Sequence, residues 1–487
     1  MTSEAPHIVV ENISFQYPES TAGISNVSIT VNSGDRVLLL GQNGSGKSTL
    51  LSLIAGKRKF SNGTIHVKGR DAFDDTRLNH VVSLIGPPWP PEAYFANTVD
   101  GVTTPNPDTA HRNLVAKELH LPLKAPIDKM SSGEKRRVQI LFGLMHPADV
   151  LLLDECSTDI DVVERATVLG RCRRECEEKG RCCVYATHIL DGVGEWATHV
   201  ALMEHGRLTR FMKMSELTEE SLVTYAHRWM SKAEVIEFCA PTNAEEVAIA
   251  AASAETREAI IIGENVNYRH ILANCNIKIY RGSRTLMIGC NGSGKTTLLN
   301  IMGSKTFYAN KNKELTVAGI PVFQDMSLNK VSVLCGDWWV QTPGGEVHVK
   351  EMVPVPLSPR AQKLQQVLAI DLNWDVRCVS AGELKRIQLF LRLHDEREVV
   401  FMDEATADLD VDQRHMLLRY LYEESVERGV TVVYSTHIFE GLGGWATDCI
   451  VMDRSKKGVH STSKAPILVD DIINTLAQLK AAEVWEL

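Results

Sequence analysis

Two glycine-rich loops of nearly identical sequence carry the most readily deduced chemistry in this chain. GQNGSGKSTLL occupies positions 41–51 and GCNGSGKTTLL occupies positions 289–299. In a GxxxxGK[ST] loop the glycines let consecutive backbone N–H groups surround phosphates, and the helix start that follows attracts anions. We expect Lys47 and Lys295 to reach the β- and γ-phosphates of a nucleotide. The residues predicted to bind it in the two loops are Gly41, Asn43, Gly44, Ser45, Gly46, Lys47, Ser48, Thr49, Gly289, Asn291, Gly292, Ser293, Gly294, Lys295, Thr296 and Thr297.

Each loop is followed at a distance by an apolar run that ends in two acids, LLLDE at 151–155 and VFMDE at 400–404. The first acid of each pair, Asp154 or Asp403, suits a magnesium contact in a nucleotide site. We expect the hydroxyls of Ser48 and Thr296 to bind the same ion. The second acid, Glu155 or Glu404, stands where a carboxylate can polarise an attacking water.

A histidine follows each aspartate by 34 residues, at the end of a further apolar run. His188 and His437 could there contact the γ-phosphate and the attacking water. A single histidine in such a place is more often a core or surface residue, so this prediction depends on the repetition.

MSSGEKRRVQILF at 130–142 and VSAGELKRIQLFL at 379–391 predict a second anion-binding feature. In each, a serine and a glycine stand at the start of an amphipathic helix, 23 residues before the aspartate. A helix start favours anions. Since each copy already has its own phosphate loop, we expect Ser131 and Gly133 to bind the nucleotide held by the second loop, and Ser380 and Gly382 the nucleotide held by the first.

The elements that must position these residues are themselves duplicated. Lys47 and Lys295 are 248 positions apart, and the matching serines, aspartates, histidines and tryptophans (Trp196 and Trp445) are 249 apart. Each copy alternates short buried strands with helices, which predicts a mostly parallel sheet flanked by helices, with ligands at the carboxyl ends of the strands. The predicted fold is therefore α/β with two P-loop NTPase domains in tandem, at 1–235 and 258–487. Residues 236–257 are the predicted linker.

Composition limits the remaining possibilities. The 487 residues are 44% hydrophobic and 23% charged, and the formal net charge is −9. No dense Lys/Arg run indicates direct nucleic-acid binding, and no apolar run approaches the roughly 20 residues that a transmembrane helix needs. The 11 cysteines form no CxxC pair, and no secretory signal precedes the first domain, so we expect a soluble protein of the cytoplasm, with the nucleus also possible. Cys290, inside the second loop, predicts a site that thiol reagents inactivate and ATP protects.

The ordered motifs resemble those of ABC ATPase domains over nearly the whole chain. These are the phosphate loop, the SxGE helix start, the apolar run with DE, the TDID or ADLD turn (158–161, 407–410) and the strand ending in TH. The resemblance implies Mg2+-dependent ATP hydrolysis, a helical signature subdomain in each domain, and two domains that pair head to tail as an ATP-dependent clamp. It also makes Tyr17 and Tyr268 the candidates to stack on adenine, with a buried core tyrosine as the alternative for each.

The sequence departs from the family pattern in two places. At the place of the usual LSGGQ signature, this chain has Ser132 or Ala381 instead of the first glycine and Glu134 or Glu383 instead of the glutamine. The loop that usually supplies a glutamine, VSLIGPPW at 82–89 or VSVLCGDW at 331–338, carries a tryptophan, Trp89 or Trp338, and no glutamine. Gln341 could cover that role in the second copy. The loss in both copies is evidence against ordinary transporter coupling.

Three classes of ABC ATPase remain. The chain looks most like the small soluble ABC ATPases associated with the Ccr–Not complex, as a fused version of their dimer, which predicts an unidentified macromolecular partner in gene expression or mRNA regulation. The alternative is the ATP-hydrolysing subunit of a transporter with separately encoded membrane subunits. A translation or ribosome-associated factor is the least favoured, since neither a long charged arm between the domains nor a CxxC-rich iron–sulfur domain is present.

Overall fold

The computed structural model describes residues 5–217 and 257–482, together with Leu222, Tyr225, Ala226 and Trp229. Positions 19–21, 61, 95–96, 104–107, 147, 158–159, 311–312, 337–344, 466 and 468 are gaps within these ranges. The chain forms two compact units. The described residues up to Trp229 belong to the first unit, and those from Arg257 onward belong to the second. The predicted linker, 236–257, lies outside the described residues except for Arg257.

The first unit is built on a six-stranded sheet with the order β10-β9-β3-β8-β7-β6. Its strands are β3 (Arg36–Leu40), β6 (Val82–Ile85), β7 (Val150–Asp154), β8 (Cys182–Ala186), β9 (His199–Glu204) and β10 (Arg207–Lys213). All neighbours pair in parallel except β9 and β10. Every residue of β3, β7 and β8 is buried, as expected for parallel strands covered on both faces.

A second, antiparallel sheet in this unit has the order β2-β1-β4-β5. It consists of β1 (Ile8–Gln16), β2 (Gly23–Val31), β4 (Asn62–Val67) and β5 (Arg70–Asp71). Helix α1 (Lys47–Ile54) shares one hydrophobic core with both sheets, in which Ile13, Leu51 and Val184 are fully buried or nearly so. This packing fixes the helix that follows the phosphate loop.

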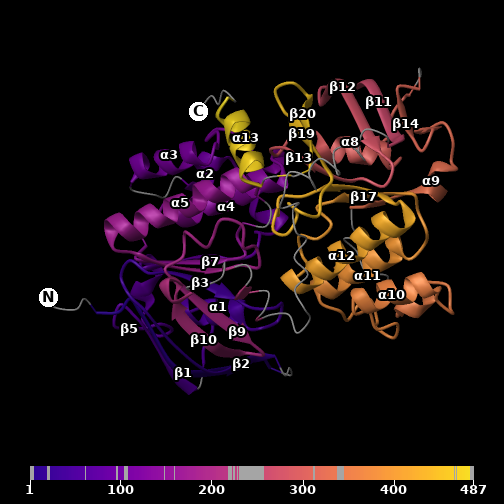
Figure 1. Ribbon diagram of the computed structural model, residues 1–487. Coiled ribbons are helices and arrows are strands. Elements are labelled where there is room, and N and C mark those ends of the chain that lie inside the picture. The colour runs from indigo at the N-terminus through magenta and orange to yellow at the C-terminus, as the bar shows by residue number, and fades with distance from the viewer. Residues whose placement is uncertain are drawn as a thin grey trace. The chain divides into compact units, whose positions relative to one another are not determined.

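Within residues 5–217, the other α-helices of the first unit are α2 (Val99–Thr103), α3 (Thr109–Glu118), α4 (Ser132–Leu144) and α5 (Val162–Lys179). Figure 1 shows them grouped at one end of this unit, away from β1 and β2. They include the predicted helix at Ser131, which is α4.

The second unit repeats this plan. Taken in the same direction as in the first unit, its six-stranded sheet has the order β20-β19-β13-β18-β17-β16, which is the same topology. Its antiparallel sheet has the order β12-β11-β14-β15. The strands are β11 (Ala259–Tyr268), β12 (Leu272–Tyr280), β13 (Arg284–Ile288), β14 (Leu315–Val317), β15 (Ile320–Pro321), β16 (Ser332–Cys335), β17 (Val399–Asp403), β18 (Thr431–Ser435), β19 (Asp448–Asp453) and β20 (Gly458–Lys464). The helices are α8 (Lys295–Met302), α9 (Leu328–Val331), α10 (Pro359–Val367), α11 (Ala381–Leu393), α12 (Val411–Arg428) and α13 (Val469–Ala481).

The predicted α/β class is confirmed, with one addition. The sequence indicated one mostly parallel sheet in each copy, whereas each unit also contains the four-stranded antiparallel sheet. Within the described parts of both units, no helix has the length and apolar character that crossing a bilayer would require.

Candidate functional site

Both phosphate loops connect a buried strand to a helix, and the glycine before each lysine is sterically required. Gly46 and Gly294 have φ angles of 102° and 94°, a region that favours glycine. A Cβ atom at Gly46 would lie 2.6 Å from Cγ2 of Ile24, and one at Gly294 would lie 2.9 Å from Cδ2 of Leu272. The loops therefore fit tightly against the neighbouring antiparallel sheets, which holds the start of α1 and of α8 in place.

The lysine of each loop folds back over the loop itself. Nζ of Lys47 donates to the carbonyl oxygens of Gly41 (2.8 Å) and Gln42 (3.1 Å). Nζ of Lys295 donates in the same way to Gly289 (2.6 Å) and Cys290 (3.2 Å). Both lysines are buried, so two ammonium groups are held at the loops where anionic phosphates would bind.

The hydroxyl that follows each lysine contacts the first acid of the matching pair. Oγ of Ser48 donates to Oδ1 of Asp154 at 3.0 Å. Burial raises the pKa of Asp154, against the hydrogen bond from Ser48 that lowers it. In the second unit burial likewise raises the pKa of Asp403, although a hydrogen bond from Thr296 opposes it.

This arrangement suits a magnesium ion. Hydroxyl and carboxylate oxygens are the hard donors that Mg2+ prefers. Among the described residues, the buried Oδ1 atom of Asp403 has no hydrogen-bond partner, which leaves it available to a cation. The pairs Ser48–Asp154 and Thr296–Asp403 therefore fit the magnesium sites predicted from the sequence.

The second acid of each pair stands next to the predicted histidine. Oε1 of Glu155 lies 3.4 Å from Nδ1 of His188 and 4.0 Å from Nζ of Lys47. Burial would raise the pKa of Glu155, but the hydrogen bond and charge of His188 and the charge of Lys47 outweigh it, so that this pKa is lowered. In the second unit Oε1 of Glu404 lies 3.3 Å from Nε2 of His437.

The segments that follow the two histidines are anchored by buried ion pairs. Arg165 on α5 lies 3.7 Å from Asp191, and Arg414 on α12 lies 2.8 Å from Glu440. The side chains of Arg414 and Glu440 are only 4% and 3% exposed. Each histidine is thus held between a buried strand and a fixed loop.

The two predicted signature serines each cap a helix. Oγ of Ser131 accepts a hydrogen bond from the backbone N–H of Glu134 at 3.3 Å and donates to its carboxylate at 2.7 Å. Ser380 and Glu383 form the same capping box at the start of α11. Gly133 and Gly382 lie in the first turn of α4 and α11. The glutamates that replace the family's glutamine therefore help to define these helix starts.

The two predicted adenine-stacking tyrosines lie in different surroundings. A hydrogen bond of 3.1 Å joins the hydroxyl of Tyr17 to Oγ1 of Thr49, which places Tyr17 beside the first loop, and the Arg58 guanidinium lies 4.8 Å from its ring. Tyr268 has Arg269 at 5.2 Å from its ring and borders a cavity of about 600 Å³. Both side chains are half-buried, and Tyr268 packs against the hydrophobic core of the second unit.

Sequence reasoning missed one buried cation close to the first site. The side chain of Arg136 on α4 is 2% exposed and donates to the backbone carbonyls of Glu155 and Gly86. Among the tryptophans of the altered loops, Trp89 packs against Phe142 of α4 with ring centroids 5.2 Å apart. Trp338, Gln341 and residues 158–159 of the TDID turn lie outside the described residues.

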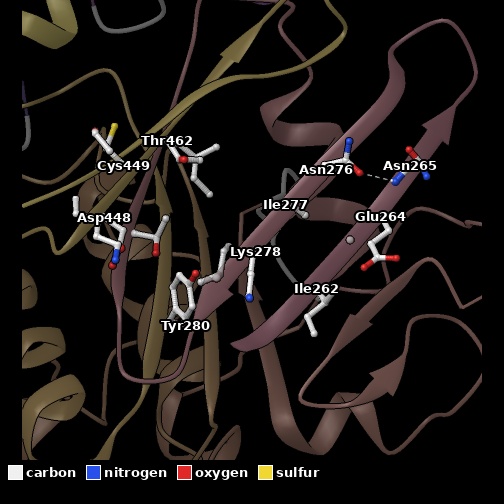
Figure 2. Close-up of a pocket in the computed structure, with 16 residues that line it drawn as sticks. Ile262, Glu264, Asn265, Asn276, Ile277, Lys278, Tyr280, Asp448, Cys449 and Thr462 are labelled. Atoms are coloured by element: carbon white, nitrogen blue, oxygen red, sulfur yellow. Dashed lines mark hydrogen bonds between the residues drawn. The ribbon is translucent and has the colours of Figure 1, made fainter. Parts of the chain in front are cut away.

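A further cavity, of about 610 Å³, lies away from these residues in the second unit. Figure 2 shows Lys278 and Tyr280 of β12 on one side and Asp448 and Thr462 of β19 and β20 on the other. At the matching positions of the first unit, the rings of His199 and Phe211 stack with centroids 5.3 Å apart. None of the predicted site residues lines this cavity.

The sequence matches a known protein family. The family model described as ABC transporter matches residues 24–158 and 272–407, more than half of the chain. The chain belongs to the ABC transporter family. It carries two ABC domains in tandem and is an ATP hydrolase, and ABC ATPases use ATP with Mg2+.

Among related ABC proteins, ABC transporter I family member 20 of Arabidopsis thaliana is 37% identical over 233 residues, 44% of this chain and 70% of that protein. CCR4-associated factor 16 of Saccharomyces cerevisiae is 30% identical over 240 residues, 45% of this chain and 83% of that protein. The archaeal ribosome recycling factor aABCE1, solved in complex with the ribosomal stalk protein aP1, superposes with a TM-score of 0.73 at 17% identity. That match covers 96% of this chain and 92% of the other, and at this identity it shows a shared ABC fold.

Proposed function

We propose that the chain binds and hydrolyses Mg2+-ATP at two sites, one built on each phosphate loop. The observation that carries this proposal is the cluster at the carboxyl ends of β3, β7 and β8. There Glu155 lies within 4.0 Å of Lys47 and 3.4 Å of His188, while Ser48 contacts Asp154. Cation, magnesium-type oxygens, carboxylate and histidine are the groups that phosphoryl transfer to water uses.

The residues act mainly by position and charge. On ATP binding, the loop N–H groups and Lys47 would hold the β- and γ-phosphates, and Ser48 and Asp154 would hold the magnesium ion, whose charge would offset that of the phosphates. Glu155 accepts a hydrogen bond from the attacking water and aligns it with the γ-phosphate. His188 orients the Glu155 carboxylate and contacts the same phosphate. Lys295, Thr296, Asp403, Glu404 and His437 perform these steps at the second site.

We further propose that the signature helix of each domain completes the nucleotide site of the other. The exposed capping boxes at Ser131 and Ser380 present a helix start with Gly133 or Gly382 in the first turn. Such a helix start attracts the γ-phosphate of a nucleotide bound to the partner domain. Closure around two ATP molecules and opening after hydrolysis would then form one mechanical cycle. Because the domains are covalently joined, their pairing does not depend on the protein concentration.

The cycle acts on a macromolecular partner in mRNA regulation or another step of gene expression, in the cytoplasm or nucleus. The 30% identity to CCR4-associated factor 16 supports this assignment, and matches of that kind cover about half of this chain, as a fused pair of domains would give. The second candidate is an ATPase subunit of a transporter, favoured by the relatives named ABC transporter I family members 20 and 21.

The experiment that separates these candidates is affinity capture of the chain with both Glu155→Gln and Glu404→Gln, with and without Mg2+-ATP, from detergent-solubilised cells. Soluble mRNA-regulation components that are retained in stoichiometric amounts only with ATP support the proposed role. A stoichiometric polytopic membrane protein would instead identify a transporter subunit. Ribosomal proteins as the main partners would assign the chain to translation.

A further inference from the structure

Arg136 is a buried cation whose guanidinium is bonded to oxygens from three parts of the first unit. Nε donates to the carbonyl of Cys156 at 2.9 Å, and one terminal nitrogen donates to the carbonyl of Glu155 at 3.1 Å. The other terminal nitrogen donates to the carbonyl of Gly86 at 2.8 Å and to Oε1 of Gln139 at 2.6 Å. Its planar fork of donors suits several acceptors at once, which a lysine ammonium cannot match in geometry.

The backbone that Arg136 contacts is conformationally unusual. Glu155 has a φ angle of 46°, a left-handed conformation that costs a non-glycine residue free energy. Its N–H donates to the carbonyl of Ala186 at 2.9 Å, and its own carbonyl accepts from Arg136. Both backbone polar groups of Glu155 are therefore hydrogen-bonded, which holds its Cα and the direction in which the side chain leaves the backbone.

The same guanidinium reaches the loop that follows β6. Strands β6 and β7 are parallel neighbours, so Gly86 and Glu155 emerge at the same edge of the sheet. Beside Arg136, Nε2 of Gln139 donates to the carbonyl of Pro87 at 2.8 Å. The next residues of that loop lead to Trp89, which packs on Phe142. The loop backbone from Gly86 to Trp89, together with the hydrogen bonds of Arg136, thus connects Trp89 to the backbone of Glu155.

The second unit has lysine at the matching position. Nζ of Lys385 lies 3.2 Å from Asp408, and its side chain is 8% exposed. The residue that matches Gln139 is Gln388, which is also buried. The two units therefore differ in the side chain at the point where the first unit connects its loop to the catalytic end of β7.

We propose that Arg136 is a positioning residue that fixes the backbone of Glu155 and connects it to the loop at 86–89, so that ATP binding and the position of Trp89 are coupled. This inference rests on the proposed function for its catalytic consequence alone, since the coupling itself can be measured without turnover. A partner that displaces Trp89 would change hydrolysis at the first site through Arg136, and the second site would respond differently because it has Lys385.

The test uses the full chain labelled with 5-fluorotryptophan. The Trp89→Phe variant identifies the 19F resonance of Trp89 among those of the 8 tryptophans. Mg2+-ATPγS is added to the parent and to the variants Arg136→Lys, Gln139→Leu and Lys385→Arg. ATP affinity, kcat and KM for ATP, and thermal unfolding are measured for each of these proteins.

In the parent and in Lys385→Arg we expect the Trp89 resonance to shift when nucleotide binds. In Arg136→Lys we expect that shift to fall to less than about a third. With Glu404→Gln added to both chains to silence the second site, kcat should fall by about tenfold relative to the chain that keeps Arg136, since misplacement of a catalytic group is costly even when binding is kept. KM and ATP affinity should stay within about twofold, because Arg136 contacts none of the nucleotide-binding groups. Gln139→Leu should reduce the Trp89 shift with a smaller effect on kcat.

Three results would overturn the inference. The first is a Trp89 resonance that does not shift in the parent when nucleotide is added. The second is an Arg136→Lys variant that keeps the full shift. The third is a fall in kcat that a smaller fraction of folded protein fully explains. If Arg136→Lys loses the coupling while Glu155→Gln leaves hydrolysis intact, the link between Arg136 and Trp89 is supported and the proposed catalytic role of Glu155 is refuted.

Discussion

Glu155 and His188 form a close pair, with Oε1 of the carboxylate 3.4 Å from Nδ1 of the imidazole. The residues come from the ends of two neighbouring parallel strands, β7 and β8, whose paired residues include Asp154 and Ala186. The second unit repeats the pair as Glu404 and His437 at 3.3 Å. A water that is hydrogen-bonded to such a carboxylate would be held at one place and in one orientation relative to the phosphate loop.

Replacement of Tyr17 by alanine should weaken ATP binding at the first site. Stacking of a base on an aromatic ring contributes about 1–3 kcal/mol, so we expect the Kd for ATP at that site to rise by roughly 5-fold or more. Tyr17→Phe keeps the ring and loses only the 3.1 Å hydrogen bond to Thr49, and it should bind ATP almost as the parent does. Titration with a fluorescent ATP analogue measures both. Equal affinity of Tyr17→Ala and the parent would make Tyr17 a structural residue.

Replacing one partner of the buried Arg414–Glu440 pair should lower the free energy of unfolding, whereas replacing both should change it little. Arg414→Ala leaves the Glu440 carboxylate buried without its cation, which typically costs about 3–5 kcal/mol in the free energy of unfolding. The double variant Arg414→Met with Glu440→Leu removes both charges and should recover most of that loss. Urea unfolding followed by circular dichroism measures each variant. An Arg414→Ala chain as stable as the parent would show that the pair contributes little.

The structure changes the expectation for Cys290. Its position in the second loop suggested a thiol that ATP would protect, but the side chain is buried, 5% exposed, with Sγ 3.7 Å from the carbonyl oxygen of Leu476 on α13. We now expect Cys290 to react with iodoacetamide at least about tenfold more slowly than the exposed Cys378, with or without ATP, because reactivity requires access. Peptide mapping by mass spectrometry measures both rates. Rapid labelling that ATP prevents would restore the original expectation.

Sequence reasoning succeeded where a motif determines its own local geometry. The spacing GxxxxGK[ST] requires a strand, a loop and a helix that begins at the lysine, and α1 and α8 begin at Lys47 and Lys295. The apolar runs before Asp154 and before His188 indicated buried parallel strands, and parallel neighbours bring their carboxyl ends together.

Tertiary contacts were harder to predict. Arg136 follows Glu134 and Lys135 near the start of an amphipathic helix, where an arginine is usually exposed, and only the fold shows that it is buried against Glu155. The antiparallel sheet was missed because it extends beyond the local hairpin of β1 and β2 to β4, which follows the phosphate loop and α1 in the chain. The burial of Cys290 depends on α13, which lies almost 200 residues further along the chain.

The most direct test of the proposed mechanism is ATP hydrolysis by the chain with both Glu155→Gln and Glu404→Gln. The matched control is Glu178→Gln with Glu427→Gln, two exposed glutamates at equivalent places on α5 and α12. We predict that the catalytic pair of substitutions lowers kcat by at least about 100-fold while ATP still binds, and that the control pair has no effect. Hydrolysis at the parent rate by the Glu155→Gln, Glu404→Gln chain would show that other groups activate the water, and would contradict the account.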